Sequence, residues 1–229
     1  MDSDTLMAVN EHLLSFVTPS KQEKMERVLG QRTDHLRIVL EDIFQPHNAS
    51  AVMRSCECFG AQNLHIIENK YAFKPNSEVS MGSAKWISLH RHREPSLDNT
   101  THCLQTLKEK GFKIVATALN ENAIPLEELS IDQPIALCFG TEEDGLSQEA
   151  LNLADECIKI PMFGFTQSFN ISVSAALCLH SLCSRIRKEL NSWELSPLEK
   201  QNVLREWLFN TVKNPLLIEE RFLKERHLS

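Results

Sequence analysis

Short apolar runs alternate with amphipathic segments through the middle of the chain. The runs are rich in β-branched or aromatic residues and are bounded by turn residues, which predicts strands. They cover residues 37–40, 64–67, 86–89, 113–117, 135–139 and 158–160. Helices are predicted between several of them, over residues 48–60, 97–110 and 147–156. This alternation predicts an α/β domain over residues 34–190, with a mainly parallel sheet and helices on both faces.

Helical extensions are predicted on both sides of this domain. The N-terminal extension, residues 1–33, contains a predicted helix over residues 18–29. Lys21, Lys24 and Arg27 lie along one side of that helix, because three-residue spacing keeps side chains on one face. The C-terminal extension, residues 191–229, is predicted to form two helices separated near Pro215.

Composition is that of an ordinary globular protein, with 42% apolar and 24% charged residues among 229. No apolar run reaches the roughly 18 residues that a membrane helix needs, and residues 1–17 lack a secretory signal pattern. The seven cysteines are odd in number and irregularly spaced, and no histidine pair follows Cys56 and Cys58 at zinc-finger spacing. We therefore expect free thiols, a cytoplasmic location, no structural metal and no membrane partner.

Charge is unevenly distributed along the chain. The net charge is −7, but residues 119–156 alone hold ten acidic residues and no Lys or Arg, so the remainder carries +3. A net acidic protein is not expected to bind nucleic acid non-specifically. The distribution still leaves room for a local basic face.

The stretch over residues 47–55 is the first that suggests chemistry. Asn48 and Arg54 belong to the helix that leaves the sheet at the carboxyl end of the first strand. Ligands bind at that edge in open α/β sheets. Taken alone, the stretch is better explained by a helix-capping Asn48 and a solvent-facing Arg54.

The second stretch, residues 139–147, places two glycines and three acids directly after an apolar strand, and Ser147 can cap the following helix. It is neither a GxGxxG turn nor a P-loop, and its carboxylates would repel a pyrophosphate. Such a loop suits a ligand with a cationic or neutral group. A tight strand-to-helix turn would also explain it.

The third stretch, residues 160–176, is an apolar loop that contains Gln167, Ser168 and Asn170, followed by a helix of small residues. Apolar loops are seldom left in water, so we expect this one to be buried against ligand, chain or subunit. Asn170 is the expected cap of the helix.

These three stretches, in this order, resemble the motifs of the SPOUT superfamily of RNA methyltransferases, and more narrowly its SpoU/TrmH branch of 2′-O-ribose methyltransferases. The resemblance covers about residues 32–190. Residues 81–86 and the short N-terminal helical segment are similar to the enzymes of this branch that methylate the D-loop guanosine of tRNA (Gm18 type).

The resemblance implies a deep trefoil knot in the C-terminal part of the α/β domain, a pocket for S-adenosylmethionine built by that knot, and a homodimer packed through it. The helix that carries Asn48 and the helix after Asn170 would form the interface. The reaction would transfer a methyl group from the sulfonium of the donor to a ribose 2′-hydroxyl of tRNA, without a metal.

By resemblance, the catalytic residues would be Arg54, Asn48, Glu142, Ser168 and Asn170. The donor pocket would be lined by Thr117, Gly140, Ile160 and Phe169. RNA contacts are expected from Lys21, Lys24, Arg27, Arg32, Lys85 and Arg185. Lys85 belongs to a basic cluster with His90, Arg91, His92 and Arg93. The family proposal makes the arginine a general base. A guanidinium keeps its proton in proteins, so we expect Arg54 to hold an RNA phosphate and orient the hydroxyl.

The sequence leaves three alternatives open. The same chemistry could act on ribosomal RNA or on another tRNA position. The chain could be a non-catalytic RNA-binding paralogue, against which the presence of Asn48, Arg54, Glu142, Ser168 and Asn170 together speaks. A nucleotide-binding oxidoreductase would need a GxGxxG turn after the first strand, and residues 41–48 contain no glycine.

Overall fold

The computed structural model describes residues 1–119 and 121–227. The chain divides into two compact units. One unit combines Met1–Arg32 with Glu194–Ser229, and the other is Thr33–Trp193. The α/β fold lies in the second unit. The first contains the segments that precede and follow it in the sequence.

The α/β unit is built on a seven-stranded sheet in the order β3-β2-β1-β6-β4-β7-β5. Every pairing between these strands is parallel, which confirms the predicted sheet type. The strands are β1 (Leu36–Glu41), β2 (Asn63–Ile67), β3 (Ser88–His92), β4 (Lys113–Thr117), β5 (Ile124–Pro125), β6 (Ile135–Phe139) and β7 (Glu156–Lys159). Of these, β4 and β6 have the predicted bounds.

Two strands are displaced from their predicted positions and one was not predicted. Residues 83–85 form a 3₁₀ turn after Gly82, which has a φ of 82°, so β3 begins at Ser88 and not at residue 86. Strand β7 begins two residues earlier than the apolar run that predicted it. Strand β5 has two residues and includes Pro125, so it is too short to leave a periodic pattern.

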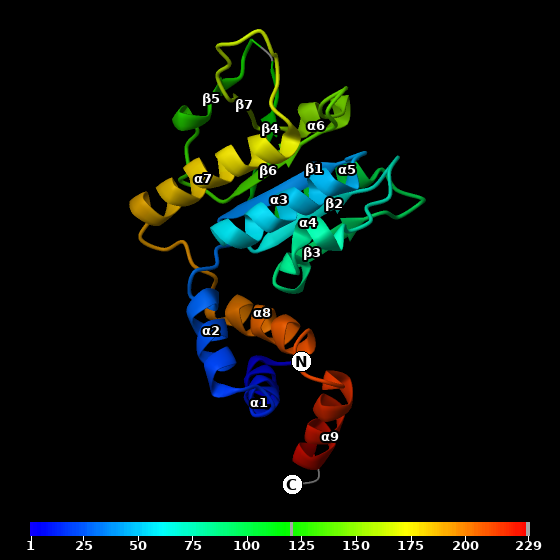
Figure 1. Ribbon diagram of the computed structural model, residues 1–229, viewed down its shortest axis with the longest axis vertical. Coiled ribbons are helices and arrows are strands. Elements are labelled where there is room, and N and C mark those ends of the chain that lie inside the picture. Colours follow the sequence, from blue (N-terminus) through cyan, green and yellow to red (C-terminus); the bar gives the residue numbers. More distant parts are fainter. Residues whose placement is uncertain (120, 228–229) are drawn as a thin grey trace. The chain divides into compact units, whose positions relative to one another are not determined.

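Helices cover both faces of the sheet (Figure 1). Helices α3 (Pro46–Phe59) and α7 (Ile171–Glu189) pack on one face, and α5 (Asn99–Glu109) and α6 (Gln148–Leu153) on the other. The short helix α4 (Ser77–Ser80) lies next to α3. Successive residues of β1 point to opposite faces: Ile38 joins the core under α3 and α7, and Val39 the core under α5.

The termini of α3 and α7 set the site described below. Helix α3 begins at Pro46, with Gln45 as its N-cap, so Asn48 lies inside the helix and the expectation that it caps it is wrong. Pro at the first turn starts the helix three residues earlier than a cap at Asn48 would, because its φ is already helical. Asn170 does cap α7, since its Oδ1 accepts from the backbone N–H of Ser172 at 2.9 Å.

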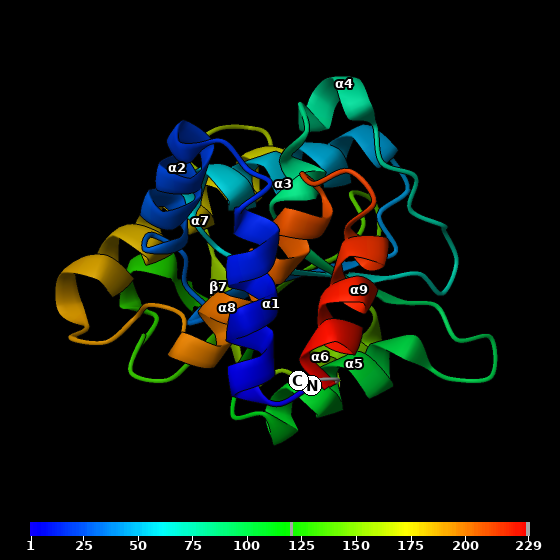
Figure 2. The ribbon, with the colours of Figure 1, turned by 90° about the horizontal axis from the view of Figure 1, so that it is seen from below.

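The helical unit comprises α1 (Ser3–Leu14), α2 (Pro19–Leu29), α8 (Pro197–Phe209) and α9 (Pro215–His227). The predicted break before Pro215 is confirmed, and α1 is an additional helix. Figure 2 shows α1 beside α8 and α9, so segments from the two ends of the sequence share one unit. The side-chain amide of Asn10 on α1 donates to the backbone carbonyl of Gln201 on α8 at 2.9 Å. Across residues 1–119 and 121–227, none of the helices is both long and apolar enough to cross a bilayer.

Candidate functional site

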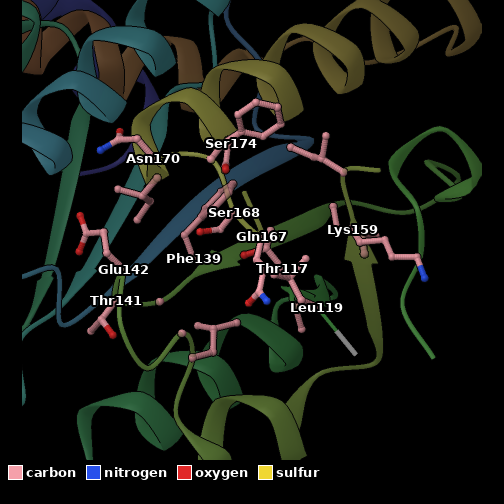
Figure 3. A pocket seen from close by; sticks show the side chains of 18 of the residues that line it. Thr117, Leu119, Phe139, Thr141, Glu142, Lys159, Gln167, Ser168, Asn170 and Ser174 are labelled. Atoms are coloured by element: carbon pink, nitrogen blue, oxygen red, sulfur yellow. The ribbon is translucent and has the colours of Figure 1, made fainter. Parts of the chain in front are cut away.

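A pocket of about 690 Å³ opens at the carboxyl edge of the sheet, where β4, β6 and β7 end (Figure 3). Thr117, Phe139 and Lys159 are the last residues of these strands, and all three line it. The start of α7 closes another side with Asn170 and Ser174. Parallel strands bring their carboxyl ends to one edge, which is where α/β folds bind ligands. The volume is in the range of small-molecule sites, roughly 300–1,000 Å³.

The acidic loop after β6 folds back on itself to form one wall. Thr141 and Gly145 exchange two backbone hydrogen bonds, of 2.9 and 3.1 Å. A Cβ on Gly140 would lie 2.0 Å from the backbone carbonyl of Gly145, so no side chain fits there. This close approach requires glycine at position 140 whether or not a ligand is bound.

A chain of hydrogen bonds joins three segments of the sequence beside the pocket. The side-chain N–H of Asn170 donates to Oδ1 of Asn48 at 3.2 Å, and the side-chain N–H of Asn48 donates to the carboxylate of Glu142. Asn48 is 4% exposed, while Glu142 and Asn170 line the pocket. The two amides are therefore aligned, each donating toward the carboxylate of the acidic loop.

Apolar side chains also line the pocket. They are those of Leu119, Phe139, Ile160 and Phe169. The hydroxyl of Thr117 donates to the backbone carbonyl of Cys138 at 2.8 Å and so ties β4 to β6. Apolar side chains and an acidic loop around one pocket suit a ligand with a flat apolar group and a cationic group.

The apolar loop between β7 and α7 is not covered by the described chain. Phe163 is 98% exposed and Phe165 is 109% exposed. Within the described residues, the loop is therefore not buried against its own chain. Of the three expected partners, a ligand and a second subunit remain. Phe169, at 44%, turns toward the pocket.

Seven of the nine predicted catalytic and donor-binding residues line this single pocket. They are Thr117, Gly140, Glu142, Ile160, Ser168, Phe169 and Asn170. Asn48 joins them through its hydrogen bonds. Arg54 is exposed on α3 and does not line the pocket of its own chain.

Further residues line the pocket without having been predicted. Figure 3 shows Leu119, Lys159 and Gln167 around it. Leu119 follows β4 by two residues and Lys159 ends β7. Their position at the carboxyl ends of predicted strands could have identified them as pocket residues from the sequence. Cys178 also lines the pocket, and burial raises the pKa of its thiol to about 12, which excludes a thiolate nucleophile there at neutral pH.

The predicted RNA-binding residues fall into different environments. Lys21, Lys24 and Arg27 are exposed on α2, and Lys85 is exposed after α4. Arg32 is 1% exposed and its guanidinium lies 5.4 Å from the ring centroid of Trp207, so its prediction as an RNA contact is wrong.

Arg185 is committed to contacts within its own unit. Its guanidinium donates to the carbonyl of Leu129 at 2.8 Å and pairs with Glu189 at 3.5 Å. The bond to Leu129 holds α7 against the segment after β5, and the pair with Glu189 lies within α7. They leave Arg185 a weaker candidate for phosphate binding than the exposed lysines.

The predicted basic cluster on β3 carries less charge than its sequence indicates. Arg91 is paired with Glu68 at 2.5 Å. Burial lowers the pKa of His90 to about 4, with the nearby Arg37 adding to the effect, and lowers the pKa of His65 to about 2. The two stacked rings are therefore neutral at pH 7.

One group of side chains has the residue types of a metal site. His65 Nδ1 lies 3.0 Å from His92 Nε2, and the thiol of Cys103 lies 3.9 Å from the same His65 nitrogen. Burial raises the pKa of the Cys103 thiol to about 12, so the thiol is protonated in the metal-free protein. The guanidinium of Arg37, 3.5 Å from His65, also opposes a dication, and we read the group as a packed polar cluster.

The chain matches the model of the SpoU rRNA Methylase family over residues 35–180. It is 43% identical to a protein of Borreliella burgdorferi named tRNA (guanosine(18)-2′-O)-methyltransferase, over 96% of this chain and 98% of the relative. It is similar to the crystal structure of the A. aeolicus TrmH/SpoU tRNA modifying enzyme, with a TM-score of 0.75, 30% identity, and coverage of 85% and 98%.

A second structure shares the fold at lower identity. The SpoU methyltransferase AviRb from Streptomyces viridochromogenes, solved in complex with the cofactor AdoMet, has a TM-score of 0.59 and 23% identity, over 71% of this chain and 64% of that one. The family match spans more than half of the sequence and includes every strand of the sheet, from β1 to β7. This chain belongs to the SpoU methylase family.

Proposed function

We propose that this protein transfers a methyl group from S-adenosylmethionine to the 2′-hydroxyl of guanosine 18 in the D-loop of tRNA. The observation that carries the proposal is the pocket in which the acidic loop, the apolar side chains and the Asn48–Glu142–Asn170 chain meet. The name of the Borreliella relative, 43% identical over nearly the whole chain, supports the choice of nucleotide.

The residues of the pocket fit this donor. S-adenosylmethionine supplies a methyl group already activated on a sulfonium, so the transfer requires no metal. Ile160 and Phe169 offer apolar contact for an adenine. Thr117, at the end of β4, and Gly140, directly after β6, would bring backbone groups beside it. The carboxylate of Glu142 favours the cationic end of the ligand.

The polar side chains would orient the acceptor. Asn170 and Ser168 lie at the start of α7 and in the loop before it, next to the carboxylate of Glu142. Asn48 fixes Asn170 and Glu142, because its side-chain oxygen accepts from Asn170 and its side-chain N–H donates to the carboxylate of Glu142. A ribose held by these groups would present its 2′-hydroxyl in a defined direction, which is the main requirement of an in-line transfer.

Arg54 would act on the pocket of a second chain. It is exposed on α3 and lies outside its own pocket, and α3 packs on α7. Helix α7 exposes Val173 and Leu177, one turn apart, at 44% and 41%. We propose a homodimer through α3, α7 and the exposed apolar loop, with that loop forming the trefoil knot of the family. In it Arg54 would hold an RNA phosphate at the partner's site, and the phosphate or water would take the hydroxyl proton.

The surface contacts with tRNA would come from Lys21, Lys24, Arg27 and Lys85, all exposed. Activity on tRNA and the presence of seven free cysteines both suit the cytoplasm. Sequence and fold resemble enzymes of tRNA and of ribosomal RNA alike, so the substrate must be tested directly.

The test uses labelled donor with unmodified tRNA and, separately, ribosomal RNA, followed by nuclease mapping of the labelled nucleotide. We expect one 2′-O-methylguanosine at position 18 of tRNA and no incorporation into ribosomal RNA. A label at another nucleotide would contradict the assignment. Glu142→Ala serves as the inactive control, because it removes the carboxylate to which Asn48 donates.

A further inference from the structure

Two exposed aromatic side chains form a pair at the edge of the sheet, outside the pocket. Phe44 follows β1 by three residues and Tyr71 follows β2 by four, so both stand at the carboxyl edge. Their ring centroids are 5.0 Å apart and their planes meet at 73°. Phe44 is 59% exposed and Tyr71 is 41% exposed. An edge-to-face pair keeps ring surface open to a third flat group.

The loop that carries Tyr71 is tied to the loop that carries Phe44. The buried carboxylate of Asp42 accepts from the backbone N–H of Lys70 at 2.7 Å and of Tyr71 at 3.4 Å. Asp42 has a φ of 51°, in the left-handed region. A residue in that region needs stabilising contacts, which here are the hydrogen bonds from the Tyr71 loop to Asp42. The same hydrogen bonds bring the ring of Tyr71 next to that of Phe44.

The remainder of the same loop is braced from two further directions. Glu68 accepts from the backbone N–H of Phe73 at 2.7 Å, and Arg91 donates to the carbonyl of Phe73 at 3.0 Å while pairing with Glu68. The hydroxyl of Ser50, on α3, accepts from the backbone N–H of Asn76 at 2.9 Å. The rings are thus held in place while exposed to solvent, which lowers the entropy lost on binding.

Basic side chains lie close to the pair in the sequence. Lys70 and Lys74 are exposed in the Tyr71 loop, and His47 is exposed at the start of α3. His47 directly precedes Asn48, so this surface is continuous in sequence with the hydrogen-bonded chain of the pocket. Aromatic rings flanked by lysines are the combination with which proteins hold single-stranded nucleic acid: bases stack on the rings and phosphates meet the cations.

We propose that Phe44 and Tyr71 form a stacking platform for an unpaired base of the tRNA loop that is methylated, with Lys70 and Lys74 contacting its phosphates. This rests on the proposed function, because it takes the RNA presented to the pocket as the occupant. A base is favoured over an apolar protein surface because the rings are flanked by cations and because the tRNA substrate must approach the carboxyl edge of the sheet. The platform binds the RNA and takes no part in the transfer itself.

The experiment compares the wild-type protein with the double variant Phe44→Leu/Tyr71→Leu, which keeps apolar bulk and removes the rings. We expect the KM and Kd for tRNA to rise about tenfold, as loss of base stacking does. The rate at saturating tRNA and the Kd for the donor should stay within about twofold, since the pair lies outside the pocket. Phe44→Tyr/Tyr71→Phe retains both rings and should bind tRNA as wild type does. Phe16→Leu removes an aromatic ring of similar exposure, 56%, from the helical unit and is the matched control.

A second readout reports stacking directly. Phe44→Trp should show tryptophan fluorescence quenching on addition of tRNA, beyond that of the wild-type protein. Unchanged tRNA affinity in the leucine double variant would overturn the platform. If the oligomeric state of that variant changed while its tRNA affinity did not, the rings would belong to a protein interface instead. If the wild-type protein binds tRNA without methylating guanosine 18, the proposed function fails, while the binding comparison still decides the role of the rings.

Discussion

At the scale of single residues, the site depends on the direction of two amides. Asn48 is buried, and its oxygen and nitrogen contact partners from two other segments of the chain. Neither the side-chain oxygen nor the side-chain nitrogen can bond to water instead, because only 4% of the residue is exposed. Removing one partner of a buried hydrogen bond costs about 1–3 kcal/mol.

Asn48→Asp should therefore damage both stability and catalysis. The change removes the N–H that faces Glu142 and sets a second carboxylate against it. We expect the free energy of unfolding to fall by about 1–3 kcal/mol and the methylation rate by at least about tenfold. Denaturant titration and initial rates measure these quantities. The double variant Asn48→Asp/Glu142→Gln, which relieves the repulsion, should regain stability. A fully active and stable Asn48→Asp would show that the chain of hydrogen bonds is dispensable.

Arg54→Lys tests the role proposed for the guanidinium. Lysine keeps the charge but loses the planar fork that contacts a phosphate at two points. We expect the rate at saturating tRNA to fall by about 10–100-fold, in line with lost positioning of the acceptor. The Kd for the donor should not change, because Arg54 does not line the pocket of its own chain. Full activity of the lysine variant would refute the positioning role.

At the scale of elements, the turn after β6 carries the acidic wall of the pocket. Gly140→Ala should disrupt it, because the new Cβ would lie 2.0 Å from the backbone of Gly145. We expect about 1–3 kcal/mol of destabilisation, the usual cost of overpacking, together with weaker donor binding. Thermal unfolding and donor titration measure both effects. Gly30→Ala, at the end of α2, is the control, since its Cβ would meet its nearest atom at 3.6 Å, an ordinary contact. Equal effects at the two glycines would contradict this reading of the turn.

The histidines at the β2–β3 edge predict an acid-labile element. Burial lowers the pKa of His65 to about 2 and that of His90 to about 4, from an ordinary value near 6.5. Below pH 6.5 the unfolded chain takes up protons that the folded chain does not, so stability should fall as the pH drops from 6.5 toward 4. Unfolding free energies measured across that range should fall less steeply for His90→Gln. If the unfolding free energy falls equally steeply with pH in the variant and the wild-type protein, His90 does not contribute to the acid lability.

The elements differed in how far sequence pattern could locate them. Strands β4 and β6 are continuous apolar runs between turn residues and were located at their bounds. The capping role assigned to Asn48 failed because Pro46 starts the helix earlier. Arg32 was misassigned because the ring that it contacts, Trp207, is 175 residues further along the chain. Local pattern carries no information about such distant pairs.

The site itself came from resemblance rather than from pattern. Asn48, Glu142 and Asn170 are brought together from α3, the turn after β6 and the start of α7. Spacing alone gave each of the three a satisfactory local explanation as a cap or turn residue. Their common place beside one pocket follows from the parallel sheet, which gathers the carboxyl ends of distant strands.

At the scale of the whole molecule, the proposed dimer predicts that subunits complement each other. Arg54→Ala and Glu142→Ala chains should each be inactive as homodimers, because each lacks one half of the proposed site. Mixed and refolded together, they should recover about a quarter of wild-type activity, because half of the dimers are mixed and each contains one intact site. Co-expressed chains with two different affinity tags allow the mixed dimers to be isolated and assayed. Absence of recovery in isolated mixed dimers would mean that Arg54 does not act across the interface.

The proposed methyl acceptor is a single atom, the 2′-oxygen of guanosine 18 of tRNA. The most direct measurement replaces that single hydroxyl by hydrogen in a synthetic tRNA and follows transfer from labelled donor. We predict no incorporation into the 2′-deoxy tRNA, full incorporation into the matched unmodified tRNA, and similar binding of both. Continued labelling of the 2′-deoxy tRNA would rule out this acceptor, because the methyl group would then be transferred to another atom.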